Sequence, residues 1–181
     1  MDLFRKICVY ISSYIPLYFL ILIKELVEIA NGNLTFNVTN TTMLLVNLAL
    51  IIIGLVGILY TYKKEQYQEV EIIEAKNLTC QNFLPYFPLF VLFALAFDLE
   101  FISMSVVYLL ILAMVGIVYV RNDLFHVNPF LNIIGFSNYE IVIRSGGETK
   151  KIHIFSNKKI RPGKMFANSI FIKNAKKTKK N

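Results

Sequence analysis

The sequence predicts a membrane all-α protein: a four-transmembrane-helix bundle that carries a small C-terminal cytoplasmic β-rich module of three to four antiparallel strands. Three observations predict it. Hydrophobic residues make up 56% of the 181 residues, more than is usual for a soluble domain. They gather in four stretches before residue 121 that are nearly free of charge. After residue 121 the pattern changes to short alternating segments rich in Lys and Arg.

The four apolar stretches are long enough, or nearly long enough, to be transmembrane helices. A helix needs about 20 apolar residues to cross the ~30 Å hydrocarbon core of a bilayer. Pro16 lies in the first stretch, and Pro85 and Pro88 lie in the third. Each proline removes a backbone hydrogen bond and is expected to kink its helix. We place the helices of a membrane domain, residues 1–122, at about 7–29, 43–62, 81–97 and 101–120.

The distribution of charge predicts how these helices are oriented. Positively charged loops stay on the cytoplasmic side of a membrane. Six Lys and Arg and nine Asp and Glu precede residue 121, whereas thirteen Lys and Arg and three Asp and Glu follow from that residue onward. The N-terminal segment, the 63–82 loop and the C-terminal third hold almost all the positive charge. We therefore predict a multi-pass membrane protein with both termini in the cytoplasm.

Few polar residues lie within the predicted helices, and none of them ionises at the centre of the bilayer. Asn47 is the most notable, because a buried amide can hydrogen-bond to a neighbouring helix. We assign it to helix–helix packing. If Asn47, Ser103 and Ser105 lined a common face of an oligomer, the protein would be a channel, transporter or immunity-type membrane subunit. This alternative stays open.

Residues 123–138, called the junction below, are predicted to lie at the membrane interface. Asn128-Pro129 favours a break in the chain, and Gly135 favours a turn. Residues 139–174 are the predicted cytoplasmic module. In it, "YEIVIR" and "TKKIHIF" alternate around a Gly-Gly turn, which is typical of a β-hairpin.

Three further segments complete this part of the prediction. Residues 165–174 are expected to form a third strand. "QEVEIIEA" in the 63–82 loop also alternates, and its glutamates could face the basic sheet. Residues 175–181, "AKKTKKN", are expected to be a flexible basic tail.

A cluster of positive charge is predicted on one turn of the module. Anionic membrane lipid is one candidate ligand, since each Lys or Arg near such a surface contributes ~1 kcal/mol. An acidic cytosolic protein is another. Direct nucleic-acid binding is not expected, because no DNA- or RNA-binding motif accompanies the charges. The residues of the cluster are Lys158, Lys159, Arg161 and Lys164.

The sequence favours a non-enzymatic function. His126 and His153 have no companions at metal-ligand spacing, and "RSGGETKK" lacks the context of a phosphate-binding loop. The two cysteines, Cys8 and Cys80, are too few for a disulfide framework. We therefore predict no catalytic residues, no metal and no cofactor.

Two stretches resemble a known family. "NFLPYFPLFVLFALAFDL" is similar to the Tyr/Pro-containing third helix of the membrane component of the Kiwa anti-phage defence system (KwaA). "NPFLNIIGFSNYEI" resembles the Asn-Pro, Gly-aromatic and Tyr-Glu-hydrophobic positions of the junction in that family. The four-helix order, the cytoplasmic termini and the short basic β-rich end are similar as well.

The resemblance implies a homo-oligomeric inner-membrane protein that senses perturbation of the envelope during phage attack. It also implies a cytosolic, DNA-binding effector (KwaB-like) as partner. The short, charge-free loop 31–42 departs from what a phage-protein receptor would need, which favours sensing of the bilayer itself. The motif positions carried over as structural hinge residues are Asn128, Pro129, Gly135, Tyr139 and Glu140.

Overall fold

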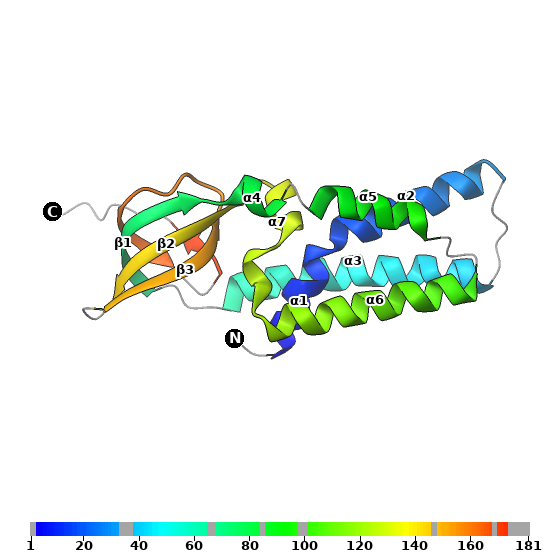
Figure 1. The fold of residues 1–181 in the computed structure, drawn as a ribbon, viewed down its shortest axis with the longest axis horizontal. Coiled ribbons are helices and arrows are strands. Elements are labelled where there is room, and N and C mark those ends of the chain that lie inside the picture. Colours follow the sequence, from blue (N-terminus) through cyan, green and yellow to red (C-terminus); the bar gives the residue numbers. More distant parts are fainter. Residues whose placement is uncertain are drawn as a thin grey trace.

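The computed structural model describes residues 3–32, 38–64, 68–83, 86–97, 101–145, 148–167 and 170–173. The molecule has two parts that follow one another along its long axis (Figure 1). Helices run side by side at one end, and a curved antiparallel sheet lies at the other. The predicted combination of a helical domain and a β-rich module is therefore present. The basic tail predicted at 175–181 lies outside the described residues.

The first predicted helix consists of two helices at an angle to each other. Helix α1 (Leu3–Ser13) and helix α2 (Ile15–Ala30) are bent by 46° at Tyr14. Pro16 lies in the first turn of α2. A proline has no backbone N–H to donate and its ring clashes with the preceding turn, which explains why the helix breaks here. The kink predicted at Pro16 is confirmed.

Two helices are each long and apolar enough to cross a membrane: α3 (Val38–Lys64) and α6 (Ile102–Arg121). The bent pair α1–α2 passes the same test when it is taken as one span. Large apolar side chains such as Leu45, Ile52 and Leu110 are exposed on these helices, as lipid-facing residues of a membrane helix would be. The described residues therefore hold two such helices, or three with the bent pair.

Where the third helix is predicted, at 81–97, the structure describes two helices, α4 (Thr79–Phe83) and α5 (Tyr86–Ala96). The kink predicted at Pro85 lies outside the described residues. At 11 residues, α5 is roughly 16 Å long, about half of the hydrocarbon thickness. It nevertheless lies beside α2, parallel to the long axis of the bundle (Figure 1).

Two helix contacts in the bundle depend on glycine. A Cβ atom at Gly57 of α3 would lie 2.5 Å from Cβ and 3.3 Å from Cα of Cys8 in α1. A Cβ atom at Gly116 of α6 would lie 2.8 Å from the ring of Tyr10. Because both distances are shorter than van der Waals contact, α1 can approach α3 and α6 this closely only where those helices have no side chain.

The sheet has five strands in the order β3-β2-β1-β4-β5, and the pairs are antiparallel. The predicted hairpin is confirmed, with Ser145 opposite Glu148 at its end. The predicted third strand is divided in two, and the last strand has only two residues. The strands are β1 (Gln68–Asn77), β2 (Ser137–Ser145), β3 (Glu148–Ser156), β4 (Gly163–Ala167) and β5 (Ile172–Lys173).

The central strand, β1, comes from the loop between two helices of the bundle. It pairs with β2 on one side and with β4 on the other. Two of its glutamates contact basic residues of the sheet, since Glu69 lies 3.9 Å from Lys164 and Glu71 lies 3.7 Å from Arg144. The central strand of the sheet therefore comes from a part of the chain that precedes α6, whereas the other four strands follow α6.

The sheet curls until its two edge strands meet. The backbone N–H of Phe155 in β3 donates to the carbonyl of Ile170, 2.7 Å away, and Phe155 forms a bridge with Phe171 beside β5. Alternate side chains on each strand fill the concave side, because successive residues point to opposite faces. This core consists of Ile72, Tyr139, Ile141, Ile143, Ile154, Ile160, Ala167 and Ile172.

Candidate functional site

The junction connects the bundle to the sheet through short helices and buried asparagines. It contains the 3-10 helix η1 (Leu124–His126) and helix α7 (Pro129–Ile133). Tyr119 of α6 donates a hydrogen bond to the carbonyl of Val127, 3.1 Å away. Gly135 has φ +94°, a conformation that side chains with a Cβ rarely adopt, and there the chain turns from α7 towards β2.

Asn128 is the residue that ties the junction to the bundle. Its side chain is 1% exposed. Its Oδ1 accepts from the backbone N–H of Leu131 at 3.1 Å and so caps α7, and its Nδ2 donates to Oγ of Ser12 in α1 at 2.9 Å. One side chain therefore holds the start of α7 and the end of α1 together.

Asn138 ties the junction to the sheet, and sequence reasoning missed it. Its Nδ2 donates to the carbonyl of His126, 2.6 Å away, and its backbone N–H donates to Oγ1 of Thr79 at 2.9 Å. Its carbonyl accepts from the N–H of Leu78 at 2.9 Å. This fully buried side chain therefore connects η1 directly to the first residues of β2.

The other residues carried over from the family motif lie in α7 and on the two sides of β2. Pro129 is buried at the first position of α7, where a missing N–H costs nothing. Tyr139 is 6% exposed and packs in the core of the sheet. Glu140 lies on the outer face, with Oε1 2.8 Å from Nζ of Lys151. Whether these residues act as a hinge stays a prediction.

Two histidines that are far apart in the sequence stack on each other at the junction. The rings of His126 in η1 and His153 in β3 are 4.5 Å apart and nearly parallel. Burial lowers the pKa of His126, and the charge of His153 lowers it further. The hydrogen bond from Lys151 lowers the pKa of Glu140. The lowered pKa favours the neutral form of His126 in its stack with His153 at neutral pH.

Acidification should weaken the junction. The pKa of His126 is below its ordinary value of 6.5 in the folded protein, so the unfolded chain takes up a proton first as the pH falls. The contribution of His126 to stability is complete above pH 6.5 and is lost progressively below it. We expect the unfolding temperature in detergent to fall more between about pH 8 and about pH 5.5 for the wild type than for His126→Gln. Equal losses would contradict this assignment.

The predicted basic cluster lies on the turn between β3 and β4. Lys158, Lys159 and Arg161 are exposed, and the buried side chain of Ile160 fixes the turn between them. Oγ of Ser156 bonds both the N–H and the carbonyl of Lys158, which closes the turn. Lys164 lies near Glu69 and so is partly neutralised. Three exposed positive charges therefore remain on one turn.

Asn47 lies in the middle of the bundle, fully buried. Its Oδ1 accepts from the hydroxyl of Tyr108 at 2.8 Å, which joins α3 to α6. Ser105 is buried and Ser103 is exposed, so these two serines do not lie on the same face of α6. Glu25 of α2 is also buried, with 5% of its surface exposed.

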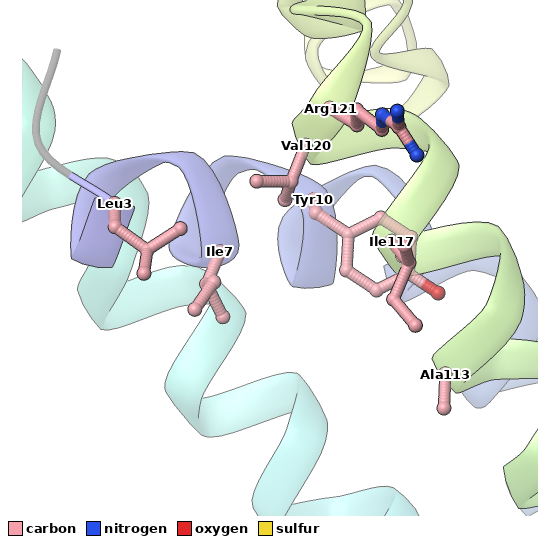
Figure 2. A pocket seen from close by; sticks show the side chains of 8 residues that line it. Leu3, Ile7, Tyr10, Ala113, Ile117, Val120 and Arg121 are labelled. Atoms are coloured by element: carbon pink, nitrogen blue, oxygen red, sulfur yellow. The ribbon is translucent and has the colours of Figure 1, made fainter.

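An apolar groove lies on the bundle between α1 and α6 (Figure 2). Its volume is ≈ 430 Å³. Figure 2 shows the guanidinium of Arg121 at one end, above the side chain of Val120. Within the described residues, no three His, Cys, Asp or Glu side chains are placed to hold a metal ion. The lining residues of the groove are Leu3, Ile7, Tyr10, Ala113, Gly116, Ile117, Val120 and Arg121.

Comparison with known proteins gives one family. The model of the family described as Anti-phage protein KwaA matches residues 5–176 of the 181. The chain belongs to the KwaA family. The matched region covers the described elements of the bundle, the junction and the sheet, except the first two residues of α1. The predicted resemblance to the KwaA family is therefore confirmed.

A curated KwaA relative is similar over a shorter region. The Kiwa protein KwaA of Escherichia coli O55:H7 (strain RM12579 / EPEC) is 32% identical over 65 residues, which are 35% of this chain and 33% of that protein. The match thus spans about a third of the length of that relative. No solved structure matches the chain. The description of the family links it to anti-phage defence.

Proposed function

We propose that this protein is a membrane sensor and scaffold subunit of an anti-phage defence complex, in which the bundle detects distortion of the inner membrane and the sheet recruits a cytosolic effector. One observation carries the proposal: buried asparagines connect the bundle, the junction and the sheet. Asn128 bonds α1, and Asn138 bonds both η1 and the first residue of α4. A change in helix packing therefore changes the position of the sheet.

The proposed orientation places the sheet, the junction and both termini in the cytoplasm. Cys80 in α4 is exposed and Cys8 in α1 is buried, and both are free thiols. A membrane-impermeant maleimide should label Cys80 in inverted inner-membrane vesicles but not in intact spheroplasts. Cys80→Ser should abolish the labelling. Labelling in intact spheroplasts would place the sheet outside the cytoplasm and overturn the orientation.

The proposed partner is the cytosolic, DNA-binding effector (KwaB-like) that membership of the family implies. Lys158, Lys159 and Arg161 form an exposed basic turn between β3 and β4. An acidic surface on the effector would bind there by charge complementarity, and anionic lipid is the competing ligand. The exposed apolar faces of α3 and α6 are where a homo-oligomer would pack within the membrane.

Uncoupling the bundle from the sheet should abolish defence without removing the protein from the membrane. We expect Pro129→Ala and Tyr139→Ala to lose protection against phage when they are expressed with the rest of the defence system. The reason is that the first alters the start of α7 and the second removes a core side chain of β2. Plaque counts, together with the amount of protein in the membrane fraction, measure this.

Pro88→Ala is the matched control, because Pro88 is exposed in α5 and belongs neither to the junction nor to the basic turn. This control should protect as the wild type does. Full protection by Pro129→Ala and Tyr139→Ala, at wild-type membrane levels, would contradict the proposal.

A further inference from the structure

A second groove lies at the junction, between the end of the bundle and the edge strand β3. Its volume is ≈ 560 Å³, and polar and apolar side chains line it in similar measure. Residues from three separate parts of the chain meet there: the segment that follows α6, strand β3 and the segment before β5. The lining residues are Asp123, Phe125, His126, Lys150, Lys151, Ile152, His153, Phe155 and Ile170.

The charged groups in and around this groove leave an excess of positive charge. Asp123 is paired with Lys6 of α1 at 2.5 Å, and Glu140 is paired with Lys151 at 2.8 Å. Both carboxylates near the groove are thus neutralised within the chain. Lys150 is exposed at the groove in addition to these two pairs. The groove therefore has one net positive charge while the histidines are neutral, and more when they are protonated.

One ring nitrogen of the stacked histidines makes no hydrogen bond to the described residues. Nδ1 of His153 is buried and has no hydrogen-bond partner among them. A buried polar atom without a partner costs about 1–3 kcal/mol, so such an atom usually marks a place for a ligand or a water. The rings of Phe125 and Phe155 provide the apolar part of the lining.

We infer that this groove binds a phosphate-bearing anion. Lysine ammonium and imidazole N–H groups are donors suited to phosphate oxygens, and charge-assisted hydrogen bonds of this kind are short and strong. The groove begins two residues after Arg121, the last residue of α6, and so lies at the height of the lipid headgroups in the proposed orientation. The ligand would be either the headgroup of an anionic phospholipid or a soluble phosphate compound.

Binding of a phosphodiester headgroup should be linked to protonation of His126. The bound phosphate favours the charged imidazolium, so phosphatidylglycerol, whose own charge does not change over this range, should bind more tightly at about pH 6 than at about pH 8. The nearby groups whose charges enter this balance come from α1, β1, β2, β3 and the junction. They are Lys6, Lys76, Asp123, His126, Glu140, Lys150, Lys151 and His153.

Titration of the full chain in uncharged detergent tests this inference with two probes, dioctanoyl phosphatidylglycerol and inorganic phosphate. Isothermal calorimetry measures binding of each to the wild type, Lys150→Ala, His153→Gln and Arg144→Ala. Arg144→Ala is the matched control, because it removes one positive charge from the neighbouring strand but does not line the groove. Circular dichroism establishes that each variant is folded before titration.

We expect Lys150→Ala and His153→Gln each to weaken binding about tenfold, the effect of losing one charge-assisted hydrogen bond, and Arg144→Ala to change it little. Binding of phosphatidylglycerol alone identifies a headgroup site, whereas binding of both probes identifies a general phosphate site. Equal weakening by all three variants would show only non-specific attraction, and absence of binding by both probes would also overturn the inference.

Discussion

Replacing Asn128 by leucine should lower the free energy of unfolding by about 3 kcal/mol: about 1 kcal/mol for the lost cap of α7 and about 2 kcal/mol for buried groups left unpaired. Leucine has a similar volume, so the loss would reflect hydrogen bonds and not a cavity. The N–H of Leu131 and one acceptor position of Ser12 would lose their partner. Unfolding by sodium dodecyl sulfate in mixed micelles measures the change.

Two further variants make this result specific. Asn128→Ser keeps a capping oxygen but cannot reach Ser12, so it should recover about 1 kcal/mol. Asn122→Leu is the control, because Asn122 is exposed and bonds only the carbonyl of Val118 in its own helix, so it should change stability by less than about 0.5 kcal/mol. If Asn128→Leu and Asn122→Leu had equally small effects, Asn128 would not connect the junction to the bundle.

The second large effect is expected at Gly57, where α1 and α3 are closest. Gly57→Ala should destabilise the bundle by about 1–3 kcal/mol, because the new Cβ would lie 2.5 Å from Cβ of Cys8. Helix propensity alone predicts the opposite sign, a gain of about 1 kcal/mol for replacing glycine by alanine. The sign of the change therefore decides between steric overlap and propensity. The same unfolding measurement applies.

The contact can be tested from its other side. Cys8→Gly should restore much of the stability of Gly57→Ala, since it removes the Cβ atom that the new methyl group would overlap. Ala49→Val is the control in the same helix, because Ala49 is exposed and its added methyl groups would face lipid. A Gly57→Ala variant as stable as the wild type would show that α1 and α3 are not in close contact.

Much of the fold could be predicted where local pattern decides the structure. The helices predicted at 43–62 and 101–120 correspond to α3 and α6, because a long uncharged apolar run has few alternatives to a helix. The hairpin β2–β3 was equally predictable from two alternating runs around a short turn. In each case, the residues that determine the element are neighbours in the sequence.

The remaining features depend on contacts between distant residues. Asn128 and Ser12 are 116 positions apart, and nothing in either local sequence indicates that they meet. His126 and His153 look isolated in the sequence, but the pairing of β2 with β3 and the position of η1 bring their rings together. Alternation identified a strand in the 63–82 loop, but not that this strand is central to the sheet.

The claim that the sheet recruits a cytosolic effector is tested most directly by affinity capture of the tagged, detergent-solubilised protein from its native host, with nuclease added to half of the sample. A stoichiometric cytosolic protein should survive nuclease. It should be lost when Lys158, Lys159 and Arg161 are replaced by glutamate, whereas Lys24→Glu, in α2 of the bundle, should retain it. Recovery of the protein alone, as a homo-oligomer, would contradict the scaffold function and favour a pore or transport subunit.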